Sequence, residues 1–266
     1  MLERFRQVKD QEIANLAKLA KTQGLPKPFS GNRVPFQASL VASTTPLAII
    51  AEYKQASPSK GPICLDLAVE DVVLAYAKYA KAISILTEEV YFQGHLTFID
   101  RAKAALQEQA IPLLRKDFLY DPLQVAMTAA TQASALLLIV RLIADTKKLA
   151  NLISYSASFG LESVVEVFDA DDLRRARQAG AKIIQVNTRD LETFTVDNHE
   201  AFKLIKAYPP KDFESWILAS GITCRDDLIL AAKADFKAAL IGTRLMQGGN
   251  PGKALEELVL GDQDAN

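Results

Sequence analysis

Two residues of opposite charge, Glu52 and Lys54, stand at the end of a short apolar run, Ala48–Tyr53. Side chains on a strand alternate between its two faces, so residues two positions apart point the same way. Burying a charge at the end of an apolar strand is costly unless it is paired. Such a pair can have pKa values suited to proton transfer. The alternative is a salt bridge with a purely structural role.

Three further polar side chains, Lys116, Glu166 and Asn187, lie within or directly after other short apolar runs. If these runs are parallel strands of one barrel, their carboxyl ends meet at one rim, where the active sites of such barrels lie. We therefore expect Glu52, Lys54 and these three side chains to share one cavity. Their number argues against a purely structural pair.

Glycines beside hydroxyl groups follow the last two apolar runs, as Ser220-Gly221 and Gly242-Thr243. Backbone N–H groups are accessible there, and a phosphate site after the last two strands, next to a short helix, is common in this fold. The sequence thus indicates an anion site. The alternative is that both glycines only form tight turns.

The apolar runs alternate with amphipathic stretches, which is the pattern of repeated strand–helix units. The expected strands are Ala48–Tyr53, Ala82–Leu86, Ile111–Leu114, Ala135–Val140, Glu162–Val167, Lys182–Val186, Ser215–Ala219 and Ala238–Ile241. The expected helices are Val69–Ala80, Thr97–Gln107, Pro122–Gln132, Asp145–Phe159, Asp171–Ala179, Glu200–Ala207, Arg225–Lys233 and Gly252–Leu258. Eight such units predict an α/β fold, a (β/α)8 TIM barrel. An open, doubly wound sheet is disfavoured because no GxGxxG follows the first strand.

The residues before the first strand have a different pattern. Apolar residues recur at helical spacing over Leu2–Gln23, a Pro/Gly-rich connector covers Gly24–Arg33, and a short helix is expected at Phe36–Val41. We therefore expect an N-terminal helical extension over residues 1–45 and a barrel domain over residues 46–262.

Composition limits the possible partners. Lys and Arg number 31 and Asp and Glu number 32, a net charge of -1, which gives no electrostatic case for nucleic acid or an anionic membrane. No apolar run is long enough to span a bilayer, and no apolar signal segment is present. Two cysteines without a CxxC motif and two histidines argue against a zinc site. We expect a cytoplasmic monomer without metal or cofactor.

The chain resembles the indole-3-glycerol-phosphate synthase family from about residue 35 to residue 258. Five motifs in the same order support the resemblance. They are Ile50-Ala51-Glu52-Tyr53-Lys54 with Ser57-Pro58-Ser59, Ser84-Ile85-Leu86-Thr87-Glu88 with Tyr91-Phe92-Gln93-Gly94, Leu114-Arg115-Lys116-Asp117-Phe118, Asn187-Thr188-Arg189-Asp190-Leu191, and Ile241-Gly242-Thr243-Arg244-Leu245-Met246. The helical extension is also a feature of that family.

The resemblance implies a reaction. The substrate would be 1-(2-carboxyphenylamino)-1-deoxyribulose 5-phosphate, which closes a five-membered ring with loss of carbon dioxide and water. Family matching makes Lys116 the general acid of ring closure. Glu166, Lys54 and Glu52 would share the dehydration step, and which of them acts as acid and which as base is left open. Asn187 would hydrogen-bond substrate hydroxyls or position Glu52.

The resemblance also implies binding residues. Ser220, Gly221, Gly242 and Thr243, with help from Lys54, would hold the phosphate. Ser57 would contact the carboxylate of the substrate, and Arg189 would steady the sugar phosphate or the loop. The candidates for the slot that holds the aromatic ring are Phe92, Phe118, Leu137 and Leu191; for each of these the alternative is plain core packing.

Two departures from the family pattern are present. The family usually has Glu-Ser-Gly where this chain has Ala219-Ser220-Gly221, so one carboxylate is missing, and Gln55-Ala56 replaces a basic pair. We expect altered electrostatics without loss of activity. The rival functions are phosphoribosylanthranilate isomerase or another phosphosugar barrel enzyme, and a non-catalytic barrel that only binds a phosphorylated ligand or a protein. The combination of Glu52, Lys54 and Lys116 disfavours both.

Overall fold

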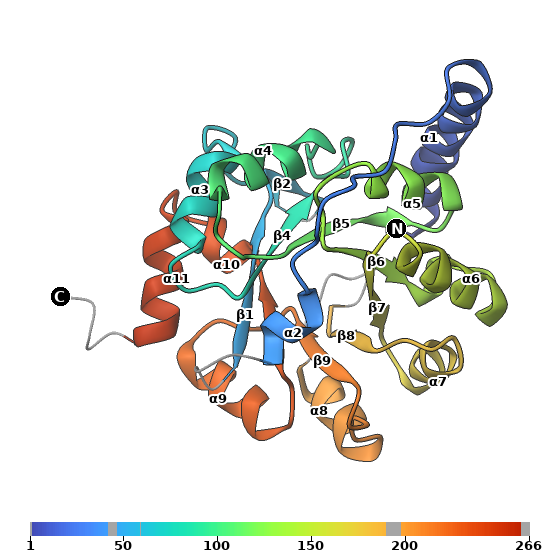
Figure 1. Ribbon diagram of the computed structural model, residues 1–266. Helices are drawn as coiled ribbons and strands as arrows, with labels where there is room; N and C mark the ends of the chain where they lie inside the picture. The colour runs from blue at the N-terminus through green and yellow to red at the C-terminus, as the bar shows by residue number, and fades with distance from the viewer. Residues whose placement is uncertain (1, 42–46, 59, 190–197, 262–266) are drawn as a thin grey trace.

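The computed structural model describes residues 2–41, 47–58, 60–189 and 198–261. Eight parallel strands form a closed barrel, in the order β1-β10-β9-β8-β7-β6-β5-β4 (Figure 1). The strands are β1 (Ala48–Tyr53), β4 (Ala82–Leu86), β5 (Leu113–Leu119), β6 (Ala135–Ile139), β7 (Glu162–Val167), β8 (Ile183–Asn187), β9 (Ser215–Ala219) and β10 (Ala238–Ile241). The predicted (β/α)8 barrel is confirmed.

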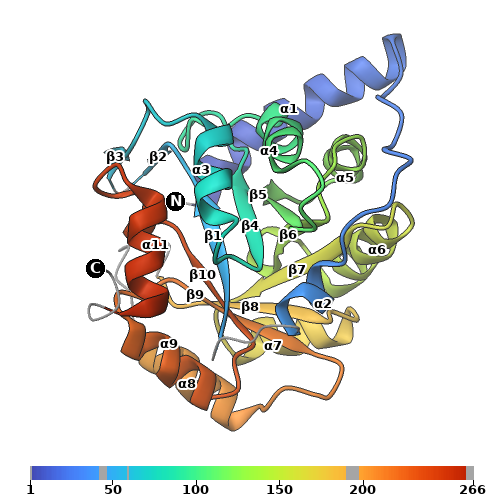
Figure 2. The same cartoon turned by 60° about the vertical axis from the view of Figure 1, so that its left-hand side comes forward.

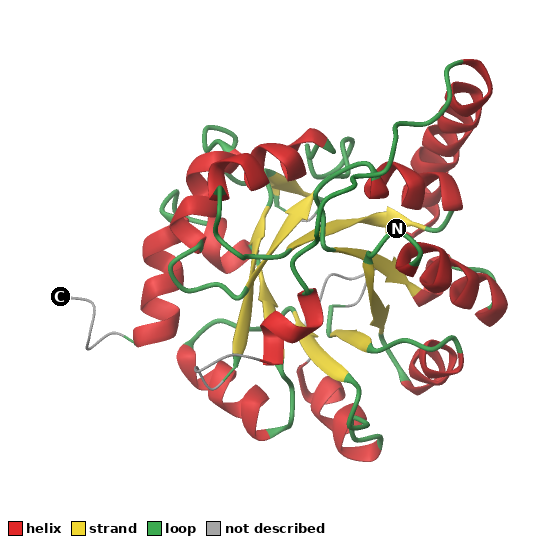
Figure 3. Cartoon of the chain, viewed as in Figure 1, coloured by secondary structure: helices red, strands yellow, loops and turns green. Residues whose placement is uncertain are grey.

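Helices surround the barrel on its outer side (Figure 3). They are α3 (Val69–Tyr76), α4 (Thr97–Leu106), α5 (Pro122–Ala129), α6 (Thr146–Ala157), α7 (Ala170–Gln178), α8 (Asn198–Ala207), α9 (Arg225–Lys233) and α11 (Pro251–Leu260). Local sequence sets where several begin, because Asp121, Asp145 and Asp169 each accept a hydrogen bond from a backbone amide in the first turn of α5, α6 and α7. None of the described helices is long and apolar enough to cross a membrane.

Three small elements were not predicted from the sequence. They are the hairpin of β2 (Ala56–Ser57) and β3 (Gly61–Pro62), the single turn η1 (Val140–Leu142), and the four-residue helix α10 (Thr243–Met246) directly after β10. The hairpin and α10 lie at the carboxyl ends of the barrel strands, so both contribute to the rim on which the predicted site residues stand.

Strand register determines which side chains enter the barrel. Glu52 of β1 pairs with Ser84 of β4, and Glu166 of β7 pairs with Gln185 of β8. Paired positions in a parallel sheet place their side chains on the same face. Because Glu52 and Glu166 both line the cavity at the carboxyl end, their partners also point into the barrel.

The predicted end of the third strand, at Leu114, is wrong. Strand β5 continues to Leu119, so Arg115, Lys116 and Asp117 lie within it. The strand tolerates the buried charges of Arg115 and Asp117 because they are partnered: Arg115 Nη2 lies 3.0 Å from Asp117 Oδ2. Thr87 also donates a hydrogen bond of 2.7 Å to Asp117. A partner distant in sequence completes this cluster.

That partner comes from α1 (Leu2–Thr22), which packs against β5 and α5. Lys9 Nζ lies 2.7 Å from Asp117 Oδ1, and both side chains are almost entirely buried. Tyr120, just after β5, donates a hydrogen bond of 2.7 Å to Asp10 of the same helix. The amino-terminal helix is therefore fastened to the third barrel strand by buried charge and a hydrogen bond.

The connector after α1 runs down the outside of the barrel to α2 (Phe36–Val41), as Figure 2 shows. Arg33 donates hydrogen bonds to the carbonyls of Ala129 (2.7 Å), Thr131 (2.8 Å) and Ala133. Glu162, at the start of β7, accepts from the first amides of α2. The segment before the barrel is thus attached at both ends. The boundary expected at residues 45 and 46, like the expected end at 262, falls outside the described residues.

Acid unfolding tests how α1 is held. Burial opposes ionisation of Asp117, but the charges of Lys9 and Arg115 outweigh it and lower the pKa of Asp117 to about 2. Its pKa in the unfolded chain is near 4, so its ionisation stabilises the fold above about pH 4, by on the order of 2 kcal/mol, and this stabilisation is lost as the pH falls toward 2. We expect Asp117→Asn to be less stable at neutral pH and to lose less stability across that window.

Urea unfolding at a series of pH values measures this difference. Asp235→Asn, at a carboxyl group that is largely exposed, serves as the control and should keep the wild-type pH dependence. Parallel pH curves for Asp117→Asn and the wild type would contradict the stabilising role of the buried cluster.

Candidate functional site

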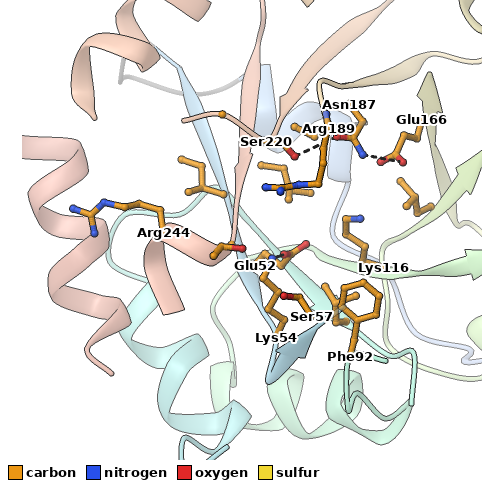
Figure 4. Close-up of a pocket in the computed structure, with 18 of the residues that line it drawn as sticks. Glu52, Lys54, Ser57, Phe92, Lys116, Glu166, Asn187, Arg189, Ser220 and Arg244 are labelled. Atoms are coloured by element: carbon orange, nitrogen blue, oxygen red, sulfur yellow. Dashed lines mark hydrogen bonds and ion pairs between the residues drawn. The ribbon is translucent and has the colours of Figure 1, made fainter. Parts of the chain in front are cut away.

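A cavity of about 590 Å³ opens at the carboxyl ends of the barrel strands (Figure 4). Nearly all side chains predicted for the site line it. They are Glu52, Lys54, Ser57, Phe92, Lys116, Phe118, Leu137, Glu166, Asn187, Arg189, Ser220, Gly221, Gly242 and Thr243. Leu191, the remaining predicted residue, lies outside the described residues. The structure therefore brings together residues that the sequence places far apart.

The predicted pair of Glu52 and Lys54 is confirmed. Glu52 Oε1 lies 2.8 Å from Lys54 Nζ, and the Glu52 side chain is buried. Burial opposes the charge of Glu52, but the positive charges of Lys54, Lys116 and Arg189 outweigh it and lower the pKa of Glu52. Glu52 is therefore an ionised carboxylate in a cavity where positive charges face it from three strands or strand ends.

Position 242 requires glycine because the Glu52 and Lys54 side chains approach its backbone closely, as well as because of the turn. A Cβ atom at this position would lie 2.1 Å from Glu52 Oε1 and 3.0 Å from Lys54 Nζ. Any side chain here would displace the carboxylate. The interpretation that this glycine only forms a tight turn is therefore incomplete, because the Glu52–Lys54 pair occupies the space that a side chain would need.

Glu166 and Asn187 form a second polar group. Asn187 Nδ2 donates to Glu166 Oε1 at 3.2 Å, and Asn187 Oδ1 accepts from Ser220 Oγ at 3.2 Å and from the Arg189 amide at 3.0 Å. Asn187 was expected either to bind substrate hydroxyls or to position Glu52. Among the described residues, its side-chain amide binds Glu166 and not Glu52. In Figure 4 this group lies across the cavity from Glu52 and Lys54, with Lys116 between them in the view.

The turn after β9 is shaped by two residues with positive φ, Ser220 (76°) and Gly221 (78°). Asn198, the first residue of α8, donates a hydrogen bond of 2.8 Å to the carbonyl of Gly221. A Cβ atom at position 221 would meet the Asn198 side chain at 2.0 Å. This turn lies beside the start of α10, whose first amides have no partner within the helix. Hydroxyl groups and backbone amides suited to an anion therefore meet at this part of the rim.

An aromatic wall closes the opposite part of the cavity. The ring of Phe5, from α1, stacks on Phe118 with centroids 3.9 Å apart, and Phe92 lies 6.0 Å from Phe118. The buried carboxylate of Glu88 accepts hydrogen bonds from the amides of Tyr91 (2.7 Å) and Phe92 (3.0 Å), which fixes the loop that carries Phe92. The wall offers an apolar, aromatic surface to a ligand in the cavity.

Sequence reasoning missed two of the residues just described. The sequence shows Phe5 only as part of an apolar helix face, and nothing near it points to a cavity whose other lining residues lie 47 or more positions away. Asn198 lies two residues before the predicted start of its helix. Its type, common at helix starts, is the only local signal that could have drawn attention to it.

The cavity thus combines the carboxylates of Glu52 and Glu166 with the lysines Lys54 and Lys116, between an aromatic wall and a rim suited to an anion. Such a set suits acid–base chemistry on an anionic molecule with a flat apolar part. Ala219 lies between the anion rim and Asn187, so at this position the wall carries a methyl group where a carboxylate is usual in the family that the sequence resembles. Among the described residues, no group of three His, Cys, Asp or Glu side chains is placed to hold a metal ion.

Comparisons of the structure with solved structures show the same fold. The chain matches a 3-hexulose-6-phosphate synthase with a TM-score of 0.63 and 16% sequence identity, covering 80% of this chain and 99% of that chain. It also matches the tryptophan synthase complex from Pyrococcus furiosus with a TM-score of 0.58 and 13% identity, covering 82% and 98% of the two chains. At these identities the likeness concerns the fold alone.

Comparisons of the sequence go further. The family model for indole-3-glycerol phosphate synthase matches residues 2–258. The indole-3-glycerol phosphate synthase of Aquifex aeolicus is 40% identical over 225 residues, which are 84% of this chain and 85% of that protein. The protein of that name from Desulfosudis oleivorans is 37% identical over 254 residues, 93% of this chain and 94% of its own. The chain belongs to the indole-3-glycerol phosphate synthase family.

Proposed function

We propose that this chain converts 1-(2-carboxyphenylamino)-1-deoxyribulose 5-phosphate into indole-3-glycerol phosphate, with loss of carbon dioxide and water, as a step of tryptophan biosynthesis. One observation carries the proposal. Glu52, Lys54, Lys116 and Glu166 share a single cavity between an aromatic wall and a rim suited to phosphate. Membership of the family supplies the identity of the substrate.

The two ends of the cavity suit the two ends of this substrate. Ser220, Gly221, Gly242 and Thr243, beside Lys54, would bind the phosphate. The aromatic ring of the substrate would lie along Phe5, Phe92 and Phe118, with Leu137 below it. Binding at both ends would place the ketone and the ring near Lys116, which reaches the cavity from β5.

Ser57 is a specific candidate for the carboxylate of the substrate. Its Oγ atom is buried, lines the cavity side of β2, and has no hydrogen-bond partner among the described residues. Buried polar atoms are rarely left unpaired, so a ligand atom is the expected partner. A hydrogen bond from Ser57 would orient the carboxylate while the apolar wall solvates its charge poorly, which favours loss of carbon dioxide.

Ring closure requires an acid. A bond forms between the carbon that bears the carboxylate and the ketone carbon, while the ketone oxygen takes a proton and becomes a hydroxyl group. We assign that proton to Lys116. Departure of carbon dioxide leaves its bonding electrons in the ring and restores aromaticity.

Dehydration follows. The hydroxyl group must leave as water, so one group protonates it and another accepts a proton from the ring system. Glu166, Lys54 and Glu52 lie around this point and would share these two roles. Asn187 would position Glu166, with which it is hydrogen-bonded, and Arg189 would steady the sugar phosphate or the loop that follows β8.

We further propose that the enzyme is a cytoplasmic monomer that needs neither metal nor cofactor and binds no nucleic acid or membrane. The near-balanced charge of the chain supports the last point. The residues already named supply acids, bases and an anion site, so each step above is accounted for by side chains of this chain.

Replacement of Lys116 tests the proposal. We expect Lys116→Met to lower kcat about 10²–10⁴-fold, because the ketone oxygen loses its proton donor. Indole absorbance or fluorescence follows the product directly and separates this activity from an isomerase, which forms no indole. Lys182→Met, at an exposed lysine before the amino end of β8, serves as the control and should turn over normally. Near-normal turnover of Lys116→Met would overturn the assignment.

The missing carboxylate at position 219 gives a second test. Since Glu52 and Glu166 remain, we expect Ala219→Glu to change kcat by no more than about tenfold, which corresponds to about 1.4 kcal/mol of activation free energy. Steady-state kinetics of both proteins with the same substrate measure the effect. A rise in kcat of several orders of magnitude would mean that alanine at position 219 severely impairs the natural site.

A further inference from the structure

Gln185 is a buried polar residue that the steps above do not use. It lies on β8, two positions before Asn187, so its side chain points into the barrel one layer deeper than that of Asn187. It is completely buried. The register of β7 and β8 places it directly beside Glu166.

The contact between the two is a hydrogen bond. Gln185 Nε2 donates to Glu166 Oε2, while Asn187 Nδ2 donates to the other carboxylate oxygen, Oε1, at 3.2 Å. Glu166 is 2% exposed, and a buried carboxylate is costly unless it is hydrogen-bonded. Both donors are neutral amides, so they orient the carboxylate without adding charge.

The other end of the Gln185 amide is unsatisfied. Its Oε1 atom is buried and has no hydrogen-bond partner among the described residues. A side-chain amide carries a donor and an acceptor on neighbouring atoms. A half turn of the amide would bring Oε1 to Glu166, where it could accept a hydrogen bond from the protonated carboxyl group. One side chain therefore has a suitable atom for each protonation state of Glu166.

We propose that Gln185 is a positioning residue that keeps Glu166 oriented through its proton cycle, donating to the carboxylate and, after the amide turns, accepting from the carboxylic acid. The inference rests on the proposed function, which gives Glu166 acid–base work. Gln185 lies outside the cavity wall and would act only through Glu166. A purely structural glutamine would affect stability without affecting the pH dependence of kcat.

The first experiment replaces Gln185 by Met, which has similar length and no amide. We expect kcat to fall about tenfold and KM to change less than about twofold, because the loss concerns the reacting state and not substrate binding. The acid limb of the kcat profile should move up by about one pH unit, because the hydrogen bond lost to the carboxylate is stronger than the one lost to the carboxylic acid. Steady-state kinetics between about pH 5 and 9 measure both effects.

Two further variants complete the series. Ser84→Ala is the matched control, since Ser84 is also fully buried, faces the barrel interior and has an unpartnered Oγ; its pH profile should equal that of the wild type. Gln185→Glu places a second carboxyl group against Glu166. The two would share a proton, so the acid limb should move up further than in the Met variant.

A double-mutant cycle shows whether Gln185 acts through Glu166. Glu166→Gln should itself lose most activity. In that background Gln185→Met should change kcat less than about twofold, because the group that it positions is already altered. Circular dichroism and thermal unfolding check that each variant folds. If the Met variant does not fold, the pH profile of Gln185→Glu tests the proposal instead.

The outcomes separate the two proposals. If Glu166→Gln loses activity but Gln185→Met and Gln185→Glu keep the wild-type pH profile, the positioning role is overturned and the proposed function stands. If Glu166→Gln turns over normally, the acid–base role of Glu166 fails, and with it the role of Gln185. A wild-type chain that forms no indole product would overturn the proposed reaction itself.

Discussion

Several charges at the carboxyl end of the closed barrel are buried and need partners within the fold. A buried charge loses its contact with water, so an ion pair or hydrogen bonds must stabilise it. Glu52 is paired with Lys54, and Asp117 with Lys9 and Arg115. Glu166 is held by two amides instead of a cation. These three arrangements determine much of the packing around the cavity, including the place of Gly242 beside Glu52.

The helix before the barrel belongs to the same system of contacts. Lys9 completes the charge cluster on the outer side of β5, while Phe5 of the same helix enters the aromatic wall next to Phe118. Docking of α1 therefore links a stabilising ion pair to the shape of the cavity. At the other end of the barrel, Arg33 and Glu162 hold the connector and α2, so these cannot shift without loss of several partly buried hydrogen bonds.

Several strands of the barrel contribute different groups to the site. Strand β1 supplies Glu52 and Lys54, β5 supplies Lys116, and the turns after β9 and β10 offer hydroxyl groups and amides. Because a barrel brings all strand ends to one rim, groups far apart in the sequence meet in one cavity. On the adjacent strands β8 and β9, Ala219 leaves a methyl group in the cavity wall, and Gln185 places an amide beneath the wall, against Glu166.

Periodicity, together with spacing within single strands, was enough to predict the alternation of strands and helices, the pairing of Glu52 with Lys54, and the set of polar residues at the strand ends. The folded chain was needed to show that β5 continues through Arg115 and Asp117, that Phe5 reaches the cavity, and that Asn187 binds Glu166. Each of these depends on a contact between elements far apart in the chain. Such contacts are set by how a helix docks and how strands register, and local residue patterns do not encode either one.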